Sequence, residues 1–172
     1  AGHKRTTTSD AFIIADRARV ADDPIRDREL TLDATTKAVL LAVSDGMGGA
    51  NAGEVASAMA IDALRRAMRS GEGDWDEVPR RAVARANSEV FTAAAAPDHR
   101  GMGATLTAVC LHGAHAHVAA VGDSRAYLLR GGRIRQVTRD QSFVQYLVDS
   151  GALSDHQRDT FAMKNVVLQA MG

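Results

Sequence analysis

The sequence predicts an α+β domain, in which β-strands are mixed with two long amphipathic helices. Apolar residues recur at three- and four-residue intervals over 55–68 and again over 76–96, a spacing typical of helices that bury one face. Runs of strand-forming residues lie before and after these two helices. The chain of 172 residues is one domain by length, and 45% apolar residues are enough to build a core.

Two strands are expected before the first helix. Asp10–Ala15 is apolar and rich in β-forming residues, and Lys37–Val43 has the composition of a buried strand that leads to Asp45. Residues 16–36 between them are charged and irregular, so we expect a solvated turn and a sheet edge there.

An antiparallel meander is expected after the second helix. Its first hairpin joins 105–111 to 115–121, and its second joins 126–130 to 133–137, each through a turn that contains glycine. Cys110 lies in the first of these strands and is expected to be a small core residue.

Beyond the meander, the pattern becomes helical again. Phe143–Val148 has the spacing of a short helix closed by Gly151, and Ser154 can cap another short helix.

The stretch that contains Asp45 carries the clearest chemical signal. The predicted buried strand ends on this carboxylate, and an isolated buried carboxylate is costly unless it is paired or coordinated. Glycines follow at positions 46, 48 and 49, so backbone carbonyls are exposed beside the carboxylate. Carboxylate and carbonyl oxygens are the ligands of hard divalent cations, which makes a metal ion the simplest partner.

Two other interpretations of this stretch stay open from the residues alone. Asp45 could cap the following helix through an Asx-type turn. The glycines could form a dinucleotide-binding loop, although Asn51 replaces the third glycine of that fingerprint and no acidic residue closes a second strand. A nucleotide-binding α/β domain is therefore the weaker alternative.

The composition argues against several classes of function. The 21 basic and 21 acidic residues balance without a basic block, which argues against nucleic-acid binding. The absence of a long apolar segment or a signal-type start argues against a membrane location or secretion. Cys110 is the only cysteine, which excludes an intrachain disulfide and a cysteine-based zinc site. We therefore expect a cytoplasmic protein.

Three histidines, His112, His115 and His117, could suggest a transition-metal cluster. They lie on the first predicted hairpin, where His117 is about 20 Å along the strand from Asp123. We therefore expect surface histidines at this position instead.

Four motifs support a resemblance to a known family. They are Ser-Asp-Gly-Met-Gly-Gly at 44–49 followed by Gly-Glu-Val-Ala-Ser at 53–57, Gly-Met-Gly-Ala-Thr-Leu at 101–106, Val-Gly-Asp-Ser-Arg-Ala-Tyr at 121–127, and Thr-Arg-Asp-Gln-Ser at 138–142. In these motifs the chain resembles the metal-dependent protein phosphatases of the PPM type, also called type 2C, in their bacterial single-domain form. The resemblance extends from about Arg5 to Gly172.

The resemblance implies a fold and its divisions. The fold is a four-layer αββα sandwich of two antiparallel sheets flanked by helix pairs. Residues 1–172 would form a single catalytic domain that is truncated at its C-terminus. Within it, 140–162 would be the flap segment beside the active site, and 165–172 would be the strand after the flap.

The resemblance also implies an activity. Family members hydrolyse phosphoserine and phosphothreonine in proteins with a water activated by Mn²⁺ or Mg²⁺, usually two or three ions, and they need no protein nucleophile. The implied partners are phosphoproteins, the substrates of a Ser/Thr kinase.

Residue by residue, the family pattern assigns five positions. Asp45 matches the carboxylate that bridges two metals, and Gly46 matches a carbonyl ligand. Asp10 matches the acid that hydrogen-bonds metal-bound water, Arg5 the arginine that grips the substrate phosphate, and Asp123 the carboxylate of a third metal. From the residues alone, Arg5 would be an ordinary surface cation, and Asp123 could equally be a cap of its turn or a ligand.

The chain departs from the family pattern at several positions. Ser9 stands where the family usually has Glu, and Met47 and Ala50 stand where its active-site His is found. The family's later Ser-Asp-Gly and Asp-Asn ligand motifs are also missing from this sequence. We therefore expect fewer bound ions, in either a fragment of a longer protein or an impaired homologue. The alternative function is a phosphatase-like module that binds a phosphorylated signalling partner.

Overall fold

The computed structural model of the protein describes residues 9–16, 31–35, 37–48, 50–70 and 77–172. Its strands are β1 (Asp10–Asp16), β2 (Val39–Met47), β3 (Gly103–Ala104), β4 (Leu106–His112), β5 (His115–Val121), β6 (Tyr127–Arg130) and β7 (Arg133–Gln136). Its helices are α1 (Ala50–Ser70), α2 (Val78–Ala94), α3 (Phe143–Asp149) and the short 3₁₀ segments η1 (Pro97–His99) and η2 (Asp155–Thr160).

The larger sheet is antiparallel and has the strand order β1-β2-β4-β5, with β3 added at the end of β2. Both strands expected before the first helix are present, β1 at Asp10–Asp16 and β2 at Val39–Met47. The central position of β2 follows from its composition, because Leu40, Ala42 and Ser44 are buried on one face.

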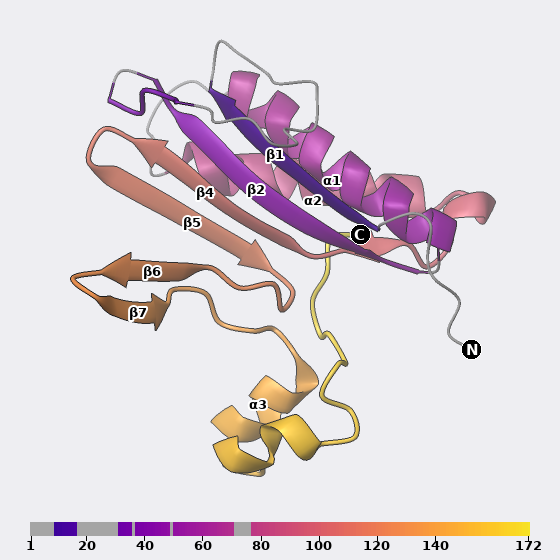
Figure 1. The fold of residues 1–172 in the computed structure, drawn as a ribbon. Helices are drawn as coiled ribbons and strands as arrows, with labels where there is room; N and C mark the ends of the chain where they lie inside the picture. Colours follow the sequence, from indigo (N-terminus) through magenta and orange to yellow (C-terminus); the bar gives the residue numbers. More distant parts are fainter. Residues whose placement is uncertain (1–8, 17–30, 36, 49, 71–76) are drawn as a thin grey trace, which may run out of the picture.

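The two long helices form at the predicted positions and lie side by side on one face of the larger sheet (Figure 1). Each buries a stripe of mostly small residues at helical spacing, so the helix backbones approach the sheet closely. These residues are Ala56, Ala60, Ala63, Leu64 and Ala67 in α1, and Val78, Ala82, Ala86 and Val90 in α2. The expected loop between the helices, at 70–74, falls largely outside the described residues.

The opposite face of the larger sheet is open in the described part of the chain. Phe12 and Val43 are each 50% exposed and Val118 is 41% exposed. These three residues share that face, because Phe12 pairs with Val43 across β1 and β2, and Leu41, on the same face of β2 as Val43, is in register with Val118 through Val109 of β4. The described residues thus supply a helix layer and a sheet of the expected sandwich, together with a two-stranded piece, β6-β7.

The two predicted hairpins are present, but they do not form one continuous meander. β4 and β5 turn at Gly113, whose φ is +59°, and β6 and β7 turn at Gly131 and Gly132. β6 and β7 pair only with each other in the described chain, because the turn that begins at Gly122 (φ +100°) leads the backbone away from β5.

The segment after β7 contains the two predicted short helices. Ser142 caps α3 by accepting a hydrogen bond from the Gln145 amide at 3.3 Å, and Gly151 follows the helix with φ of +74°. Ser154 caps η2 in a reciprocal capping box with Gln157.

The prediction of a strand at 165–172 is wrong. This segment makes isolated bridges from Val167 to Ser142 and from Met171 to Ala104. It changes partner between these two contacts, so no neighbouring strand accompanies it along its length. Met171 is nonetheless fully buried and belongs to the hydrophobic core.

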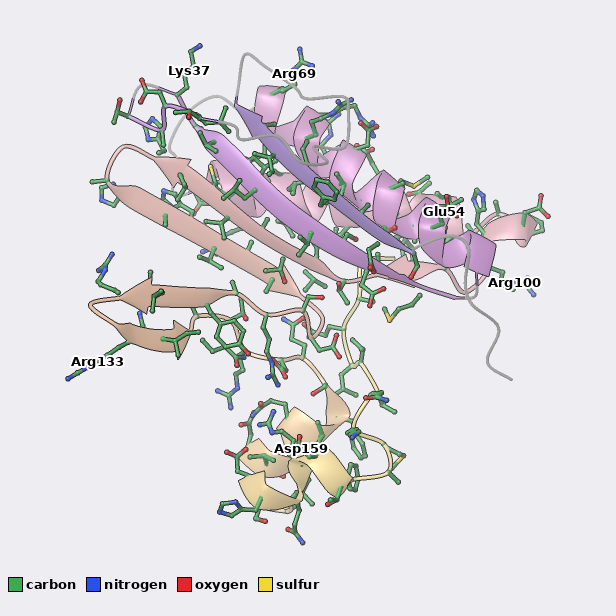
Figure 2. The ribbon with its side chains drawn as sticks, viewed as in Figure 1. Lys37, Glu54, Arg69, Arg100, Arg133 and Asp159 are labelled. Carbon is green, nitrogen blue, oxygen red and sulfur yellow. The ribbon has the colours of Figure 1, made fainter. Side chains whose placement is uncertain are left out.

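Most of the described charged side chains lie at the periphery, as Figure 2 shows for Lys37, Arg69 and Arg133. Within the described ranges, α1 and the other helices are too short or too polar to cross a membrane.

Candidate metal-binding site

Asp45 lies beside Asp10 on neighbouring strands. The register of β1 and β2 places these two residues directly opposite each other. The strand does not end on Asp45, as the sequence had suggested, but continues to Met47 because β3 pairs with Gly46 and Met47. Asp45 is also exposed, so the expectation of a buried carboxylate at the end of the strand is wrong.

The backbone of Asp45 is fixed by Thr105, which lies between β3 and β4. The Asp45 amide donates to Thr105 Oγ1 at 3.0 Å, and the Thr105 amide donates to the Asp45 carbonyl at 2.8 Å. Thr105 Oγ1 also shares a 2.8 Å hydrogen bond with Ser124 Oγ. Thr105 is buried, so these bonds hold Asp45 in register with the turn that carries Asp123.

The surroundings of Asp45 are negatively charged. Neighbouring atoms remove part of its hydration, and a side-chain hydrogen bond with Asp10 together with the charges of Asp10 and Asp123 further raise the pKa of the Asp45 carboxyl. The Ser9 hydroxyl donates to Asp45 Oδ1 at 3.3 Å and acts in the opposite direction. Among the described residues, the two whose charges shift the Asp45 pKa, Asp10 and Asp123, are thus both carboxylates. This concentration of negative charge favours a bound cation.

Gly46 is required by packing as well as by any role of its carbonyl. A Cβ at Gly46 would lie 1.9 Å from the Gly53 carbonyl oxygen in the first turns of α1. Gly48 (φ +106°) is similarly close to the Gly101 backbone, with 2.4 Å from its would-be Cβ to the Gly101 oxygen. Sequence reasoning explained these glycines by exposed carbonyls and missed the close contact between β2 and α1. The partner glycines at 53 and 101 were the available signal.

Asp123 lies in the turn between β5 and β6 and is half-buried. The turn is held by Thr107, whose hydroxyl donates to the Ser124 carbonyl at 2.7 Å, and by Gln141, whose side chain accepts from the Gly122 amide at 2.8 Å. The negative charge of Asp123 acts on Asp45 together with that of Asp10, and both raise the pKa of the Asp45 carboxyl. Arg5, the predicted phosphate-binding residue, lies outside the described residues.

The donors at this end of the sheet suit a partly hydrated ion better than a fully protein-ligated one. In the described part of the chain, no group of three or more His, Cys, Asp or Glu side chains is arranged to hold a metal. Asp45, Asp10 and the Gly46 carbonyl are the oxygen donors that the fold brings to this point, and hard divalent cations accept such oxygens together with water.

The histidines and the cysteine occupy ordinary positions. His115 and His117 lie on β5 with ring centroids 6.4 Å apart, and they belong to no metal-binding group within the described ranges. Cys110 is 2% exposed in the core, and burial raises the pKa of its thiol to about 11. It is the core residue that the sequence predicted.

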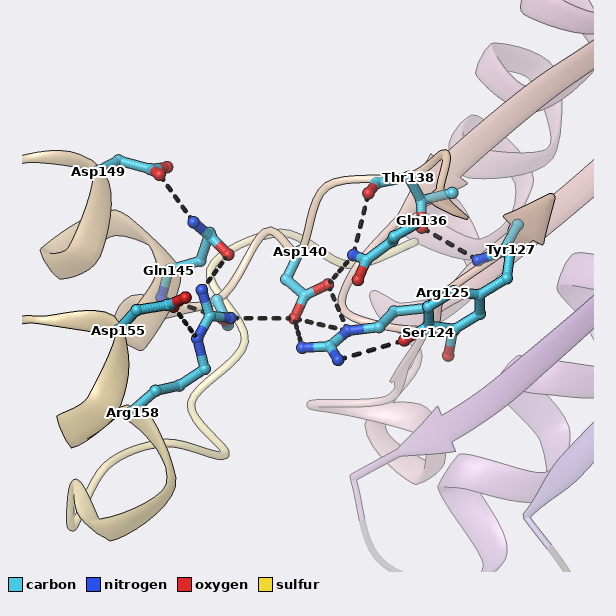
Figure 3. Close-up of polar contacts among 12 residues, drawn as sticks. Ser124, Arg125, Tyr127, Gln136, Thr138, Asp140, Gln145, Asp149, Asp155 and Arg158 are labelled. Carbon is cyan, nitrogen blue, oxygen red and sulfur yellow. Dashed lines mark hydrogen bonds and ion pairs between the residues drawn. The ribbon is translucent and has the colours of Figure 1, made fainter. Parts of the chain in front are cut away.

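A second polar cluster, centred on Asp140, was missed by sequence reasoning (Figure 3). Asp140 is the one charged residue that is buried among those the structure describes. Arg125 Nε donates to both of its carboxylate oxygens, at 2.9 and 3.0 Å, and hydrogen bonds to Asp140 and Tyr127 raise the pKa of Arg125 further above its ordinary value. The only sequence signal was an arginine and an aspartate in two motifs 15 residues apart.

Comparison with known proteins gives a consistent result. The family model described as protein phosphatase 2C matches residues 16–165. The Ser/Thr protein phosphatase PstP of Mycobacterium tuberculosis is 39% identical over 134 residues, which cover 77% of this chain and 26% of that protein. The Ser/Thr phosphatase stp of Listeria monocytogenes is 37% identical over 139 residues, which cover 77% of this chain and 55% of that protein.

Solved structures agree. The crystal structure of the M. tuberculosis phosphatase PstP/Ppp has a TM-score of 0.76 at 34% identity, covering 99% of this chain and 64% of that one. The catalytic domain of PstP in complex with two manganese ions has a TM-score of 0.71 at 32% identity, covering 99% and 63%. These likenesses confirm the expected fold class. This chain spans between about a quarter and two thirds of the length of these proteins.

Proposed function

Because this chain belongs to the protein phosphatase 2C family, we propose that it carries part of the active site of a metal-dependent phosphatase acting on phosphoserine and phosphothreonine in proteins. The observation that supports this most directly is the pairing of Asp10 with Asp45 across β1 and β2, where partial loss of hydration, a hydrogen bond with Asp10 and the nearby negative charges raise the pKa of Asp45. The names of the relatives, all Ser/Thr phosphatases, support the substrate class and do not favour a non-catalytic binding module.

We assign the metal to the end of the larger sheet. Asp45 and the Gly46 carbonyl would hold Mn²⁺ or Mg²⁺, and Asp10 would accept hydrogen bonds from the ion's water. In the whole natural protein, Asp123 would contribute to a further ion, as the family pattern implies. When bound, a divalent ion polarises the phosphoryl group and makes water a stronger nucleophile.

The chain's own residues orient these groups. Thr105 holds the Asp45 backbone at both its amide and its carbonyl, so the carboxylate projects from a rigid strand. The close contact of Gly46 with the Gly53 backbone of α1 restricts the position of the Gly46 carbonyl. We also propose that Arg5 binds the substrate phosphate through its guanidinium fork, that 140–162 forms the flap, and that the domain functions in the cytoplasm, where Cys110 stays reduced.

The proposal is tested by metal-dependent turnover in the whole natural protein that contains this chain. Mn²⁺ is expected to raise hydrolysis of a phosphothreonine peptide, and Asp45→Asn is expected to abolish the metal-dependent part. Asp62→Asn is the matched control, because Asp62 pairs with Arg65 and Arg66 on the surface of α1. Equal, metal-independent turnover by wild type and Asp45→Asn would refute the proposed function.

Metal binding gives a second test on the 172-residue chain itself. With Ser9 in place of a carboxylate, we expect at most one weakly bound Mn²⁺, since each missing carboxylate removes charge that offsets dehydration of the ion. Calorimetric titration measures the number of sites. Two tight sites would show that donors other than Asp10, Asp45, Gly46 and Asp123 complete the centre.

A further inference from the structure

Asp140 joins three pieces of chain that are otherwise separate. Arg125, which donates to it, belongs to the turn that carries Asp123, and Gln136 Nε2 donates to Asp140 Oδ1 at 3.1 Å from β7. Arg158 reaches the same carboxylate from η2, with 3.8 Å between its Nη1 and Asp140 Oδ2 (Figure 3). A buried carboxylate therefore connects the helical segment α3–η2 to the sheets.

The contacts of Asp140 differ in strength. Arg125 and Gln136 hold it at hydrogen-bond distances, whereas Arg158 makes one longer ion pair. Arg158 is fixed on its other side by Gln145 Oε1 of α3 at 2.7 Å and by Asp155 Oδ1 at 3.2 Å. Arg158 thus belongs to the helical segment. Its ion pair with Asp140 connects that segment to the rest of the protein and is weaker than the hydrogen bonds that Arg125 and Gln136 make to the same carboxylate.

The same segment is tied at its base to the turn that carries Asp123. The Phe143 amide donates to the Val166 carbonyl at 2.8 Å, and the Leu168 amide donates to the Gln141 carbonyl at 2.7 Å. Gln141 in turn exchanges hydrogen bonds with Gly122 through its amide and its side chain. We call residues 142–168 the C-terminal unit, so that Asp140 and Gln141, to which it is attached, lie outside it. Its base adjoins the proposed site, and Arg158 attaches its helical part.

The C-terminal unit exposes large apolar side chains. Tyr146 is 59% exposed, Leu168 52%, Met163 49% and Val166 43%. Such side chains can contact the polypeptide part of a phosphoprotein but offer nothing to its phosphate. The orientation of the unit relative to the Asp123 turn therefore determines whether these side chains contact a protein substrate.

We propose that Arg158 is a positioning residue: its ion pair with Asp140 holds the C-terminal unit in the orientation that contacts the polypeptide of a phosphoprotein substrate. This inference rests on the proposed phosphatase function. It predicts that loss of Arg158 weakens the binding of a phosphoprotein while the reaction at phosphorus proceeds normally, since no contact of Arg158 reaches the Asp45 end of the sheet among the described residues.

Three variants separate this role from a general effect of charge. Arg158→Gln removes the ion pair, and Arg158→Lys keeps a charge but loses the planar fork that spans Gln145 and Asp155. Arg139→Gln is the matched control. Arg139 lies just before the unit and also pairs with a residue in it, Asp149 on α3, but its side chain is 71% exposed, so this pair should contribute little, and Arg139 does not touch Asp140 in the described contacts.

Steady-state kinetics of the whole natural protein with Mn²⁺ supply the first measurement, on a phosphothreonine peptide and on p-nitrophenyl phosphate. Arg158→Gln is expected to raise the KM for the peptide about tenfold, with kcat for both substrates and the KM for p-nitrophenyl phosphate within about twofold of wild type. Arg158→Lys should show a smaller rise in the peptide KM, and Arg139→Gln none. An unchanged peptide KM, or equal losses on both substrates, would overturn the proposal.

Hydrogen exchange supplies the second measurement and does not depend on activity. Amides of α3 and η2 should exchange faster in Arg158→Gln but not in Arg139→Gln, while those of α1 stay protected in both. Unchanged exchange in α3 and η2 would overturn the anchoring role even in an active enzyme. If wild type hydrolyses neither substrate, the proposed function fails, and exchange still decides whether Arg158 anchors the unit. If Arg158→Gln does not fold, Arg158→Lys carries both comparisons in the same direction.

Discussion

Asp45 and Asp140 are two aspartates with opposite surroundings. Asp45 is exposed and faces the carboxylates of Asp10 and Asp123, whereas Asp140 is buried and faces the guanidinium groups of Arg125 and Arg158. The fold neutralises the second charge with its own residues. Asp45 has no such compensation among the described charges that shift its pKa, because Asp10 and Asp123 are themselves negative. Excess charge of one sign points to a ligand, and balanced charge points to a structural role.

Removing the partner of Asp140 should give the largest effect. Arg125→Met leaves a buried carboxylate with only Gln136 and the longer contact from Arg158, so the free energy of unfolding should fall by about 3 kcal/mol. Urea denaturation measures the change. Arg139→Met is the control, because an exposed pair of this kind contributes about 0.5 kcal/mol or less. Equal losses in the two variants would mean that burial of Asp140 does not matter.

The Asp45 side is held by packing rather than by ion pairs, which Gly46→Ala tests. The added methyl group would overlap the Gly53 backbone, so α1 must move away from β2, at a cost of about 2 kcal/mol. Gly101→Ala is the control. Its Cβ would meet no atom within 4 Å, so only the strain of its positive φ remains, about 1 kcal/mol. Thermal unfolding of both variants measures the difference, and a harmless Gly46→Ala would contradict the packing.

The two aspartates should respond to neutralisation with opposite signs. In the absence of metal, Asp45→Asn removes repulsion and should raise the free energy of unfolding slightly, by about 0.5 kcal/mol or less because the site is exposed and screened. Asp140→Asn should lower it, because Arg125 loses its charged partner. Saturating Mn²⁺ should remove the advantage of Asp45→Asn, because only wild type gains from binding. Destabilisation by Asp45→Asn without metal would contradict the repulsion.

The pH dependence of stability should report the repulsion at Asp45 and give the smallest effect. The pKa of Asp45 is higher in the folded protein than its ordinary value, so the folded state binds this proton more tightly. The contribution of Asp45 to stability therefore falls as pH rises from its ordinary pKa of 3.8 past the raised folded value, and is constant above. The measurement is the urea midpoint of the metal-free wild type minus that of Asp45→Asn, determined at several pH values. A difference that does not change with pH would contradict the prediction.

The sequence predicted those features that depend on local patterns. The spacing of alanines in α1, the strand propensity of β1 and β2, and the glycine turns of the hairpins are all local, and each element formed where expected. The same patterns brought Asp10 and Asp45 onto adjacent strands.

What the sequence did not predict depends on distant partners. The burial of Asp140 needs Arg125, the extension of β2 beyond Asp45 needs β3, and the loss of a strand at 165–172 follows from its divided pairing. No local propensity contains these contacts. The glycine at 46 illustrates the point, because its neighbour across the contact, Gly53, becomes visible only when β2 and α1 are packed together.

The grip of Thr105 on Asp45 has a consequence for the order of folding. The two residues are 60 positions apart, and both long helices lie between them. Closing so long a loop is entropically costly until α1 and α2 have formed and returned the chain to β2. The strand end that carries Asp45 should therefore be completed late, after the rate-limiting step. We expect Thr105→Val to speed unfolding while leaving the refolding rate nearly unchanged, a φ-value near zero. A φ-value near one would instead place the site within the nucleus from which the domain grows.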